Sequence, residues 1–316
     1  MRIFFATDIH GANRVFTKFL NSVNIFQADV GVVGGDIMGK KLIPIVENSD
    51  GSWRVEFFGQ VRSIPKDKAS SELAQAETLL NDTGFYTYRA SQEEVRKLEQ
   101  DRKYLDSIFE KLMLQRLDEW VALTAKKMES SKKKVFITGG NDDLPIVDSF
   151  LRRPGPLVYC ESDLVRLDKD HEMISSGYAN MTPWKCPRDI TEEELEQKIE
   201  SMASKVTDPK SAVFNLHVPP IDTALDECPK LDTSVDPPKI LMGEITSGGS
   251  KSVRKIIEKY QPLLSLHGHI HESRGVEKLG RTVCLNPGSE YSEGVLRGVL
   301  VNLEKEKVKG YQFTNG

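Results

Sequence analysis

The chain has 316 residues, of which 39% are hydrophobic and 28% are charged, and its formal net charge is -4. This balance gives no electrostatic argument for a nucleic acid or a membrane surface as partner, and no segment reaches the roughly 20 apolar residues that span a bilayer. The first apolar run is too short for a signal peptide, and the four cysteines are scattered without a CxxC pair. These features predict a cytoplasmic protein with reduced thiols.

The first 36 residues have the pattern of a strand, a crossover helix and a second strand. The apolar runs RIFFAT and DVGVVGG flank the segment ANRVFTKFLNSV, in which apolar residues recur at helical spacing. Three later β-rich runs, KKVFITGGNDD, AVFNLHVPP and PLLSLHGHIHES, also end in polar residues. Because ligands of open α/β sheets bind beyond the carboxyl ends of the strands, these separate motifs are expected to meet in one cleft.

Two segments interrupt this α/β pattern within an otherwise single domain of residues 1–316. We predict a helical insertion over residues 66–130, because apolar residues between Ser91 and Glu129 recur at the spacing of one long helix or a bent pair. Its balanced charges indicate a solvated surface, and the long helix could mediate a homo-oligomer. Residues 218–250 are rich in Pro, Asp, Ser and Gly, so we predict an irregular lid loop there. Three further strands are expected to end the chain.

The histidines are concentrated in the polar segments that follow the predicted strands. Five of the six lie there beside Gly, Asp or Pro, whereas His171 lies in a charged turn and is expected at the surface. Asp8, Asp36 and Asn141 lie in the same kind of segment. Carboxylate, imidazole and amide groups together form a donor set suited to two borderline divalent ions such as Mn, Fe or Zn.

Five blocks resemble, in chain order, the signature of the calcineurin-like metallophosphoesterase superfamily. They are Asp8-Ile9-His10, Gly35-Asp36, Gly140-Asn141-Asp142-Asp143, His217 and Gly268-His269-Ile270-His271. Each block alone can occur by chance, whereas all five in this order, each after a predicted strand, form a strong signal. The resemblance implies a four-layer α/β/β/α sandwich and hydrolysis of a phosphoester by a hydroxide that bridges two metal ions.

The same resemblance implies which residues hold the two ions. One ion would be held by Asp8, His10 and His271, the other by Asn141, His217 and His269, and Asp36 would bridge them. Residues i and i+2 of an extended strand end point to one side, so Asp8 and His10 are expected to reach one ion together. His267, which shares the alternation of His269 and His271, either orients a metal ligand or is a core histidine.

The sequence departs from the family directly after Asn141. Many members carry a histidine there, which stabilises the transition state or protonates the leaving group, but this chain has Asp142. Nearby cations keep a carboxylate ionised, so Asp142 would be a poor general acid. It could act indirectly by orienting a water or a histidine, it could be bypassed by a substrate with a good leaving group, or it could cap the next helix.

Three functions are compatible with these residues. The first is hydrolysis of a small phosphorylated molecule or nucleotide, as a monoester or diester, with Asn141 and Asp142 at the catalytic site. The second is an interaction scaffold that docks partners through the insertion, which an exposed apolar stripe on residues 91–129 would support. The third is a nuclease, which needs a basic groove and is disfavoured by the acidic segment 218–250. Trp184, in a proline-rich loop, could stack on a base or plug the lid.

Overall fold

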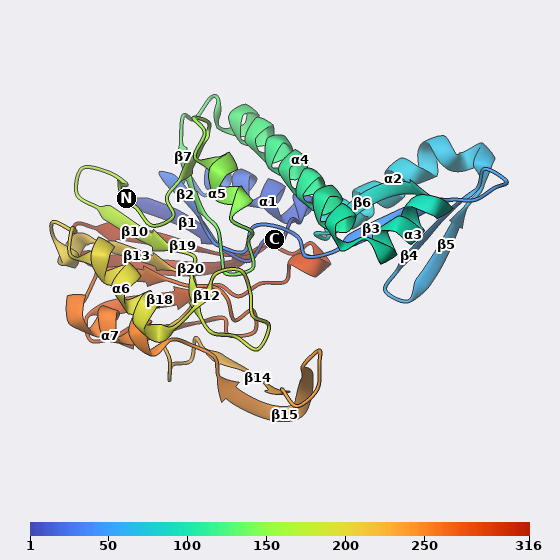
Figure 1. Ribbon diagram of the computed structural model, residues 1–316. Helices are drawn as coiled ribbons and strands as arrows, with labels where there is room; N and C mark the ends of the chain where they lie inside the picture. The colour runs from blue at the N-terminus through green and yellow to red at the C-terminus, as the bar shows by residue number, and fades with distance from the viewer.

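The computed structural model describes all 316 residues and is organised around two six-stranded sheets (Figure 1). The strand order of the first sheet is β20-β19-β1-β2-β7-β8. Its members are β20 (Lys307–Asn315), β19 (Arg297–Glu304), β1 (Arg2–Ala6), β2 (Val30–Gly34), β7 (Lys134–Thr138) and β8 (Leu157–Tyr159). Strands β1, β2, β7 and β8 are parallel, so their carboxyl ends lie at one edge.

The second sheet has the order β17-β18-β16-β13-β10-β9 and a parallel centre from β18 to β10. Its members are β17 (Gly275–Leu279), β18 (Thr282–Asn286), β16 (Leu264–Leu266), β13 (Val213–Leu216), β10 (Glu172–Ser176) and β9 (Leu164–Arg166). The three strands predicted for the end of the chain are present, but they divide between the sheets, with β18 in the second and β19 and β20 in the first. The predicted mixed α/β class is confirmed.

Side-chain alternation along the strands produces a separate core on each face. Ile3 and Phe5 point into a core that also contains Val213 and Leu266 of the second sheet, whereas Phe4 points to the opposite face. That opposite face is covered by α1 (Asn13–Ile25), α4 (Arg102–Met128) and α5 (Ile146–Leu151). The outer face of the second sheet is covered by α6 (Glu192–Ala203) and α7 (Lys251–Tyr260).

A lobe inserted between β2 and β7 extends to the right of Figure 1. It contains a sheet of order β5-β4-β3-β6 formed by β3 (Leu42–Glu47), β4 (Trp53–Phe57), β5 (Gln60–Ile64) and β6 (Tyr86–Ser91), a short 3-10 helix Lys66–Lys68, and the helices α2 (Ala69–Asp82) and α3 (Gln92–Gln100). The predicted bent helix pair is α3 and α4, with Asp101 capping α4 at the bend. Strand β6 corrects the purely helical expectation for 66–130.

The helical insertion does not expose an apolar stripe. Every large hydrophobic side chain between residues 91 and 129 is buried or half-buried, including Met113, Leu117 and Trp120 on the face of α4 that packs on the first sheet. The feature that would have supported a docking scaffold is therefore absent from these residues. No helix combines the length and apolarity needed to cross a membrane.

Two sequence-based expectations are wrong in detail. Residues 218–250 are not irregular throughout, because β14 (Glu227–Asp232) and β15 (Lys239–Ser247) form an antiparallel hairpin. The cluster of Thr, Ser, Asp and Pro lies in its turn, where such residues are favoured.

His171 is buried instead of exposed: its Nδ1 lies 2.8 Å from Asp168 Oδ1 and its Nε2 lies 3.2 Å from the Glu304 carbonyl oxygen. A further short parallel pair joins β11 (Ala179–Asn180) to β12 (Asp189–Ile190).

Candidate metal centre

The seven predicted metal ligands lie beyond the carboxyl ends of five strands drawn from both sheets. Asp8 and His10 follow β1, Asp36 follows β2, Asn141 follows β7, His217 follows β13, and His269 and His271 follow β16. The structure brings all of these side chains to one place; His269 and His271 are half-buried and the others are buried. The strand-end reasoning therefore located the cluster, although the local backbone differs from the expectation.

The backbone at the ligands is left-handed and not extended. Asp8, His10, Asp36 and His269 have φ angles of 53°, 45°, 46° and 67°. Strand β1 ends at Ala6, so Asp8 and His10 converge through tight turns, and the expected strand alternation is wrong there. Each left-handed non-glycine residue costs roughly 1–2 kcal/mol, and such strain collects at functional sites.

Backbone hydrogen bonds between the loops after β1 and β2 hold this strained conformation. The N–H groups of Asp8 and His10 donate to the carbonyl oxygens of Gly35 and Asp36, both at 2.9 Å. Asp143 adds a carboxylate that accepts the N–H groups of Ile37, Met38 and Gly140, at 2.9, 2.9 and 2.7 Å. These hydrogen bonds join the loops after β1, β2 and β7 to one another without a metal ion.

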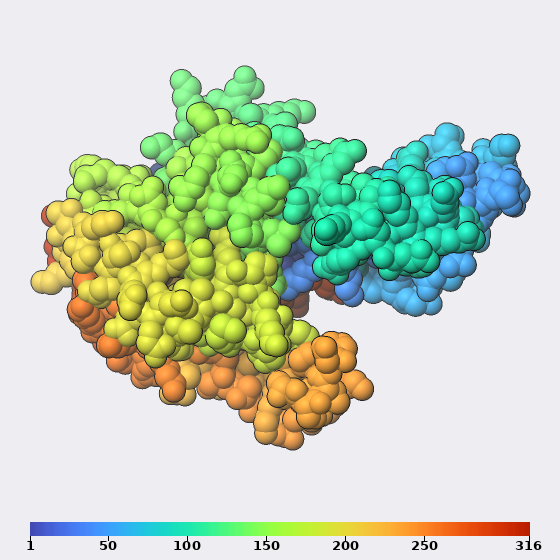
Figure 2. All heavy atoms as spheres, viewed as in Figure 1, coloured from blue at the N-terminus to red at the C-terminus, as the bar shows by residue number.

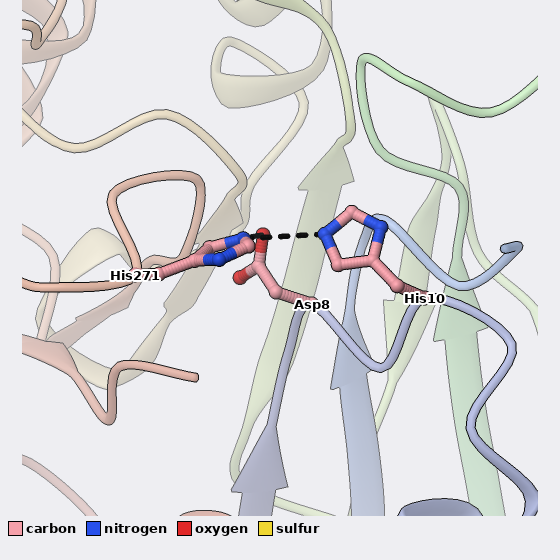
Figure 3. A group of neighbouring side chains, drawn as sticks. All are labelled: Asp8, His10 and His271. Atoms are coloured by element: carbon pink, nitrogen blue, oxygen red, sulfur yellow. Dashed lines mark hydrogen bonds and ion pairs between the residues drawn. The ribbon is translucent and has the colours of Figure 1, made fainter. Parts of the chain in front are cut away.

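Asp8, His10 and His271 form the first group of possible ligands (Figure 3). The Nε2 atoms of His10 and His271 lie 3.2 Å apart, and His271 Nε2 lies 3.3 Å from Asp8 Oδ1. The Tyr291 ring packs against His10 with 4.5 Å between ring centroids. Two imidazole nitrogens and a carboxylate oxygen at this spacing are a suitable donor set for one divalent cation.

His217 is the central residue of the second group. Its Nδ1 lies 2.9 Å from the carbonyl oxygen of Gly34, which can only accept, so Nδ1 carries a hydrogen and Nε2 is the atom left to bind a proton or a metal ion. That Nε2 is buried without a hydrogen-bond partner, 3.5 Å from Asp36 Oδ1 and 3.9 Å from Asp8 Oδ1. A buried imidazole nitrogen that faces two carboxylates and has no hydrogen-bond partner is a position suited to a cation, so the residues present fit a bound metal.

Asn141 and His269 complete the second group. His269 Nδ1 lies 2.9 Å from Asn141 Oδ1, and the His269 and His217 ring centroids are 5.4 Å apart. The amide nitrogen of Asn141 donates to Asp189 Oδ1 at 3.0 Å, which turns its oxygen toward the histidines. Asp189 was not singled out from the sequence, because only the fold brings β12 beside the loop after β7.

The charges of the centre favour a cation. Burial alone would lower the pKa of His217, but the Asp36 and Asp8 carboxylates outweigh it and raise the pKa to about 10. Burial would likewise raise the pKa of Asp8, but His217 and His271 outweigh it and hold that pKa below its usual range. Two carboxylates that stabilise a positive charge this strongly would stabilise a divalent ion in place of the proton.

Asp142 does not cap a helix, since α5 begins at Ile146 with Pro145 before it. Its N–H donates to Asp36 Oδ1 at 3.0 Å, and its carboxylate forms an ion pair with Lys40 and accepts the Cys186 thiol at 2.7 Å. Burial would raise the pKa of Asp142, but the Lys40 charge and the hydrogen bonds from Cys186 and Lys40 together outweigh it, and the pKa is lowered. The helix-cap interpretation is wrong, and Lys40 and Cys186 are site residues that sequence reasoning missed.

His267 bridges the segments on either side of His217. Its Nδ1 lies 2.7 Å from the Leu216 carbonyl oxygen and 3.2 Å from that of Val218, and its own N–H donates to Leu285. Burial lowers its pKa to about 4, so the ring is neutral. His267 therefore supports the backbone that carries His217 and makes no hydrogen bond to the His217 ring.

The centre opens onto a cleft of about 1570 Å³. Asp36, Asn141, His269 and His271 line it together with Lys40 and Asp142. The remaining walls come from the start of α4, the loop 181–187 and the β14–β15 hairpin. An ester larger than inorganic phosphate can therefore reach the ligands.

Comparison with known proteins relates this chain to others mainly through its fold. No family model matches it. The uncharacterized protein MJ1162 of Methanocaldococcus jannaschii is 34% identical over 116 residues, which cover 36% of this chain and 46% of that protein. The match thus spans less than half of the relative's length. It shows that one segment of the two chains has a common ancestor, and it assigns no activity.

Solved structures share the architecture over almost the whole chain. One matches 99% of this chain and 98% of its own with 17% identity and a TM-score of 0.58, and TT1561 of Thermus thermophilus matches 100% and 97% with 12% identity and a TM-score of 0.54. The neighbours also include an archaeal phosphodiesterase, with 11% identity over 100% of this chain and 99% of its own and a TM-score of 0.36. The likeness establishes the α/β fold alone.

Proposed function

We propose that the protein is a metal-dependent phosphoesterase with the four-layer α/β/β/α sandwich of the calcineurin-like metallophosphoesterases. It would hydrolyse a phosphomonoester or phosphodiester of a small molecule or nucleotide with two divalent ions, Mn, Fe or Zn. The observation that carries the proposal is the unpartnered, buried Nε2 of His217 facing Asp8 and Asp36. The layered cores and the order of the five blocks agree with it.

The residues would divide between the two ions around Asp36. Asp8, His10 and His271 would hold one ion, and Asn141, His217 and His269 the other. When bound, such ions supply a water of lowered pKa and stabilise charge on phosphoryl oxygens. The chain's own contribution is to fix the donors: Asp36 lies between the two groups, and the neutral amide of Asn141 leaves the centre more cationic than a third carboxylate would.

Lys40 and Asp142 take the place of the histidine that many family members have after Asn141. Lys40 lines the cleft beside Asp36 and His271, its side chain is 48% exposed, and its positive charge is held in place by Asp142. The Asp142 carboxylate forms an ion pair with Lys40 and accepts the hydrogen of the Cys186 thiol, so it has no proton to donate. We therefore assign the pair to charge stabilisation: Lys40 contacts a phosphoryl oxygen, and Asp142 positions Lys40.

Replacement of Lys40 tests this assignment. We expect Lys40→Met to lower kcat/KM by about 100-fold, the scale of losing one preorganised donor to developing charge. The loss should be greater for p-nitrophenyl phosphate, a dianion, than for bis-p-nitrophenyl phosphate, a monoanion, and the metal content should not change. Lys41→Met is the matched control, because Lys41 is exposed and does not line the cleft. Equal losses for both esters, or loss of metal, would contradict the assignment.

The proposed function itself is tested by metal content and turnover. The protein would be purified without chelator, its metals quantified by mass spectrometry, and both nitrophenyl esters assayed with added Mn. We expect near two metal equivalents per chain and turnover that a chelator removes and Mn restores. No retained metal, together with no turnover under Mn, Fe or Zn, would refute the proposal.

A further inference from the structure

The cleft is larger than a phosphoryl group requires. At about 1570 Å³ it exceeds the few hundred to about 1,000 Å³ of ordinary small-ligand sites. Figure 2 shows the hollow between the hairpin, in orange, and the helical segment that contains α3 and the start of α4, in teal. Only four of the predicted metal ligands are among its lining residues, so most of the lining belongs to residues that would face the rest of the substrate.

Exposed apolar side chains gather on two walls of this cleft. Met181, Trp184 and Ile240 are 56%, 55% and 60% exposed, and all three line it. Twelve large hydrophobic side chains are exposed in the whole chain; these three line the cleft, and three more lie elsewhere on the hairpin. Solvent-exposed apolar groups concentrated around one cleft mark a surface that a ligand covers.

The charges of the cleft argue against a polyanionic ligand. Lys40, Arg102, Lys185, Lys230 and Lys239 line it, but so do Asp36, Asp106, Glu110, Asp142 and Glu272. Five cations against five anions give no basic track of the kind that holds a nucleic-acid backbone. Phe109, Met113 and Ile270 add further apolar lining to the same cleft.

We propose that the substrate is an amphiphilic phosphoester that carries an alkyl chain. Its phosphoryl group would bind at the metal centre, while the chain would lie between the loop with Met181 and Trp184 and the hairpin with Ile240. The aliphatic character of two of these three exposed side chains, and their continuity with the metal centre in one cleft, favour an alkyl chain over a sugar or a polymer. This inference rests on the proposed phosphoesterase function.

The test uses a series of p-nitrophenyl alkyl phosphates with methyl, butyl and octyl groups, each below its micellar concentration, and the full-length metal-loaded protein. The leaving group is constant, so differences in kcat/KM report the alkyl chain. One fully buried methylene contributes about three- to fourfold. Because the walls cover the chain only in part, we expect kcat/KM to rise at least about tenfold from butyl to octyl.

Two variants and a control locate the chain. Trp184→Ala and Ile240→Ser should flatten the dependence of kcat/KM on chain length, because each lowers kcat/KM for the octyl ester more than for the methyl ester. Met242→Ser is the matched control, because Met242 is 92% exposed on the same strand β15 and does not line the cleft. It should retain the full dependence on chain length.

The outcomes separate this inference from the proposed function. Turnover of all three esters at equal kcat/KM, or a chain-length dependence that both variants retain, would overturn the alkyl-chain inference and leave the phosphoesterase intact. Preference for the p-nitrophenyl ester of thymidine 5′-phosphate, lost in Trp184→Ala but not in Ile240→Ser, would assign the cleft to a nucleobase and also overturn it. Release of nitrophenol from none of the esters, with any divalent ion, would refute the proposed function.

Discussion

Asp36→Asn is expected to abolish turnover. Asp36 lies between the two groups: its Oδ2 lies 3.7 Å from His10 Nε2, and its Oδ1 lies 3.5 Å from His217 Nε2. Asparagine keeps the shape but removes the negative charge, and it places an amide N–H toward one of these nitrogens or toward the Asp142 N–H. We expect kcat to fall by at least about a thousandfold, which corresponds to about 4 kcal/mol of barrier.

The same substitution should change metal content. Without a shared carboxylate, the two groups cannot compensate for the repulsion between two dications, so we expect at most one metal equivalent by mass spectrometry. Asp118→Asn, on the exposed face of α4, removes the same charge far from the centre and should change neither quantity. Two retained equivalents with undiminished kcat would show that Asp36 does not bridge the ions.

Much of the fold was accessible from the sequence because its central strands are buried on both faces. Such strands read as continuous apolar runs, and RIFFAT, DVGVVGG and AVFNLH all became central strands of the two sheets. The hairpin was not accessible, because β15 is exposed along almost its whole length and lacks a buried face that would impose alternation. Its turn residues dominated the composition of the segment.

The candidate site was predictable in its residue types and not in its geometry. Asp8 and His10 converge because left-handed turns follow β1, and the enrichment of Asp and His at positive φ is too small to locate such turns from a single sequence. Lys40 and Cys186 were missed for another reason. Lys40 lies in the segment between β2 and β7, and Cys186 lies in the loop after β11. Only the folded chain brings both side chains to Asp142.

His217→Ala should lower both activity and stability, whereas His171→Ala should lower stability alone. Both histidines are buried and bonded to a backbone carbonyl oxygen, so each loss is expected to cost about 1–3 kcal/mol of unfolding free energy. Only His217 directs a free imidazole nitrogen at two carboxylates. We therefore expect kcat to fall about 100- to 1,000-fold in His217→Ala, the scale of losing one preorganised electrostatic group, and to stay unchanged per folded molecule in His171→Ala.

The comparison of these two variants distinguishes a metal ligand from a packing residue. Chemical denaturation gives the stability of each variant, and mass spectrometry gives its metal content in the same preparation. A metal ligand predicts loss of about one equivalent in His217→Ala and none in His171→Ala, while similar midpoints of unfolding would exclude misfolding as the cause. If both variants kept their metal and their kcat, the buried Nε2 of His217 would be an unpaired core nitrogen, and the observation that carries the proposed function would be lost.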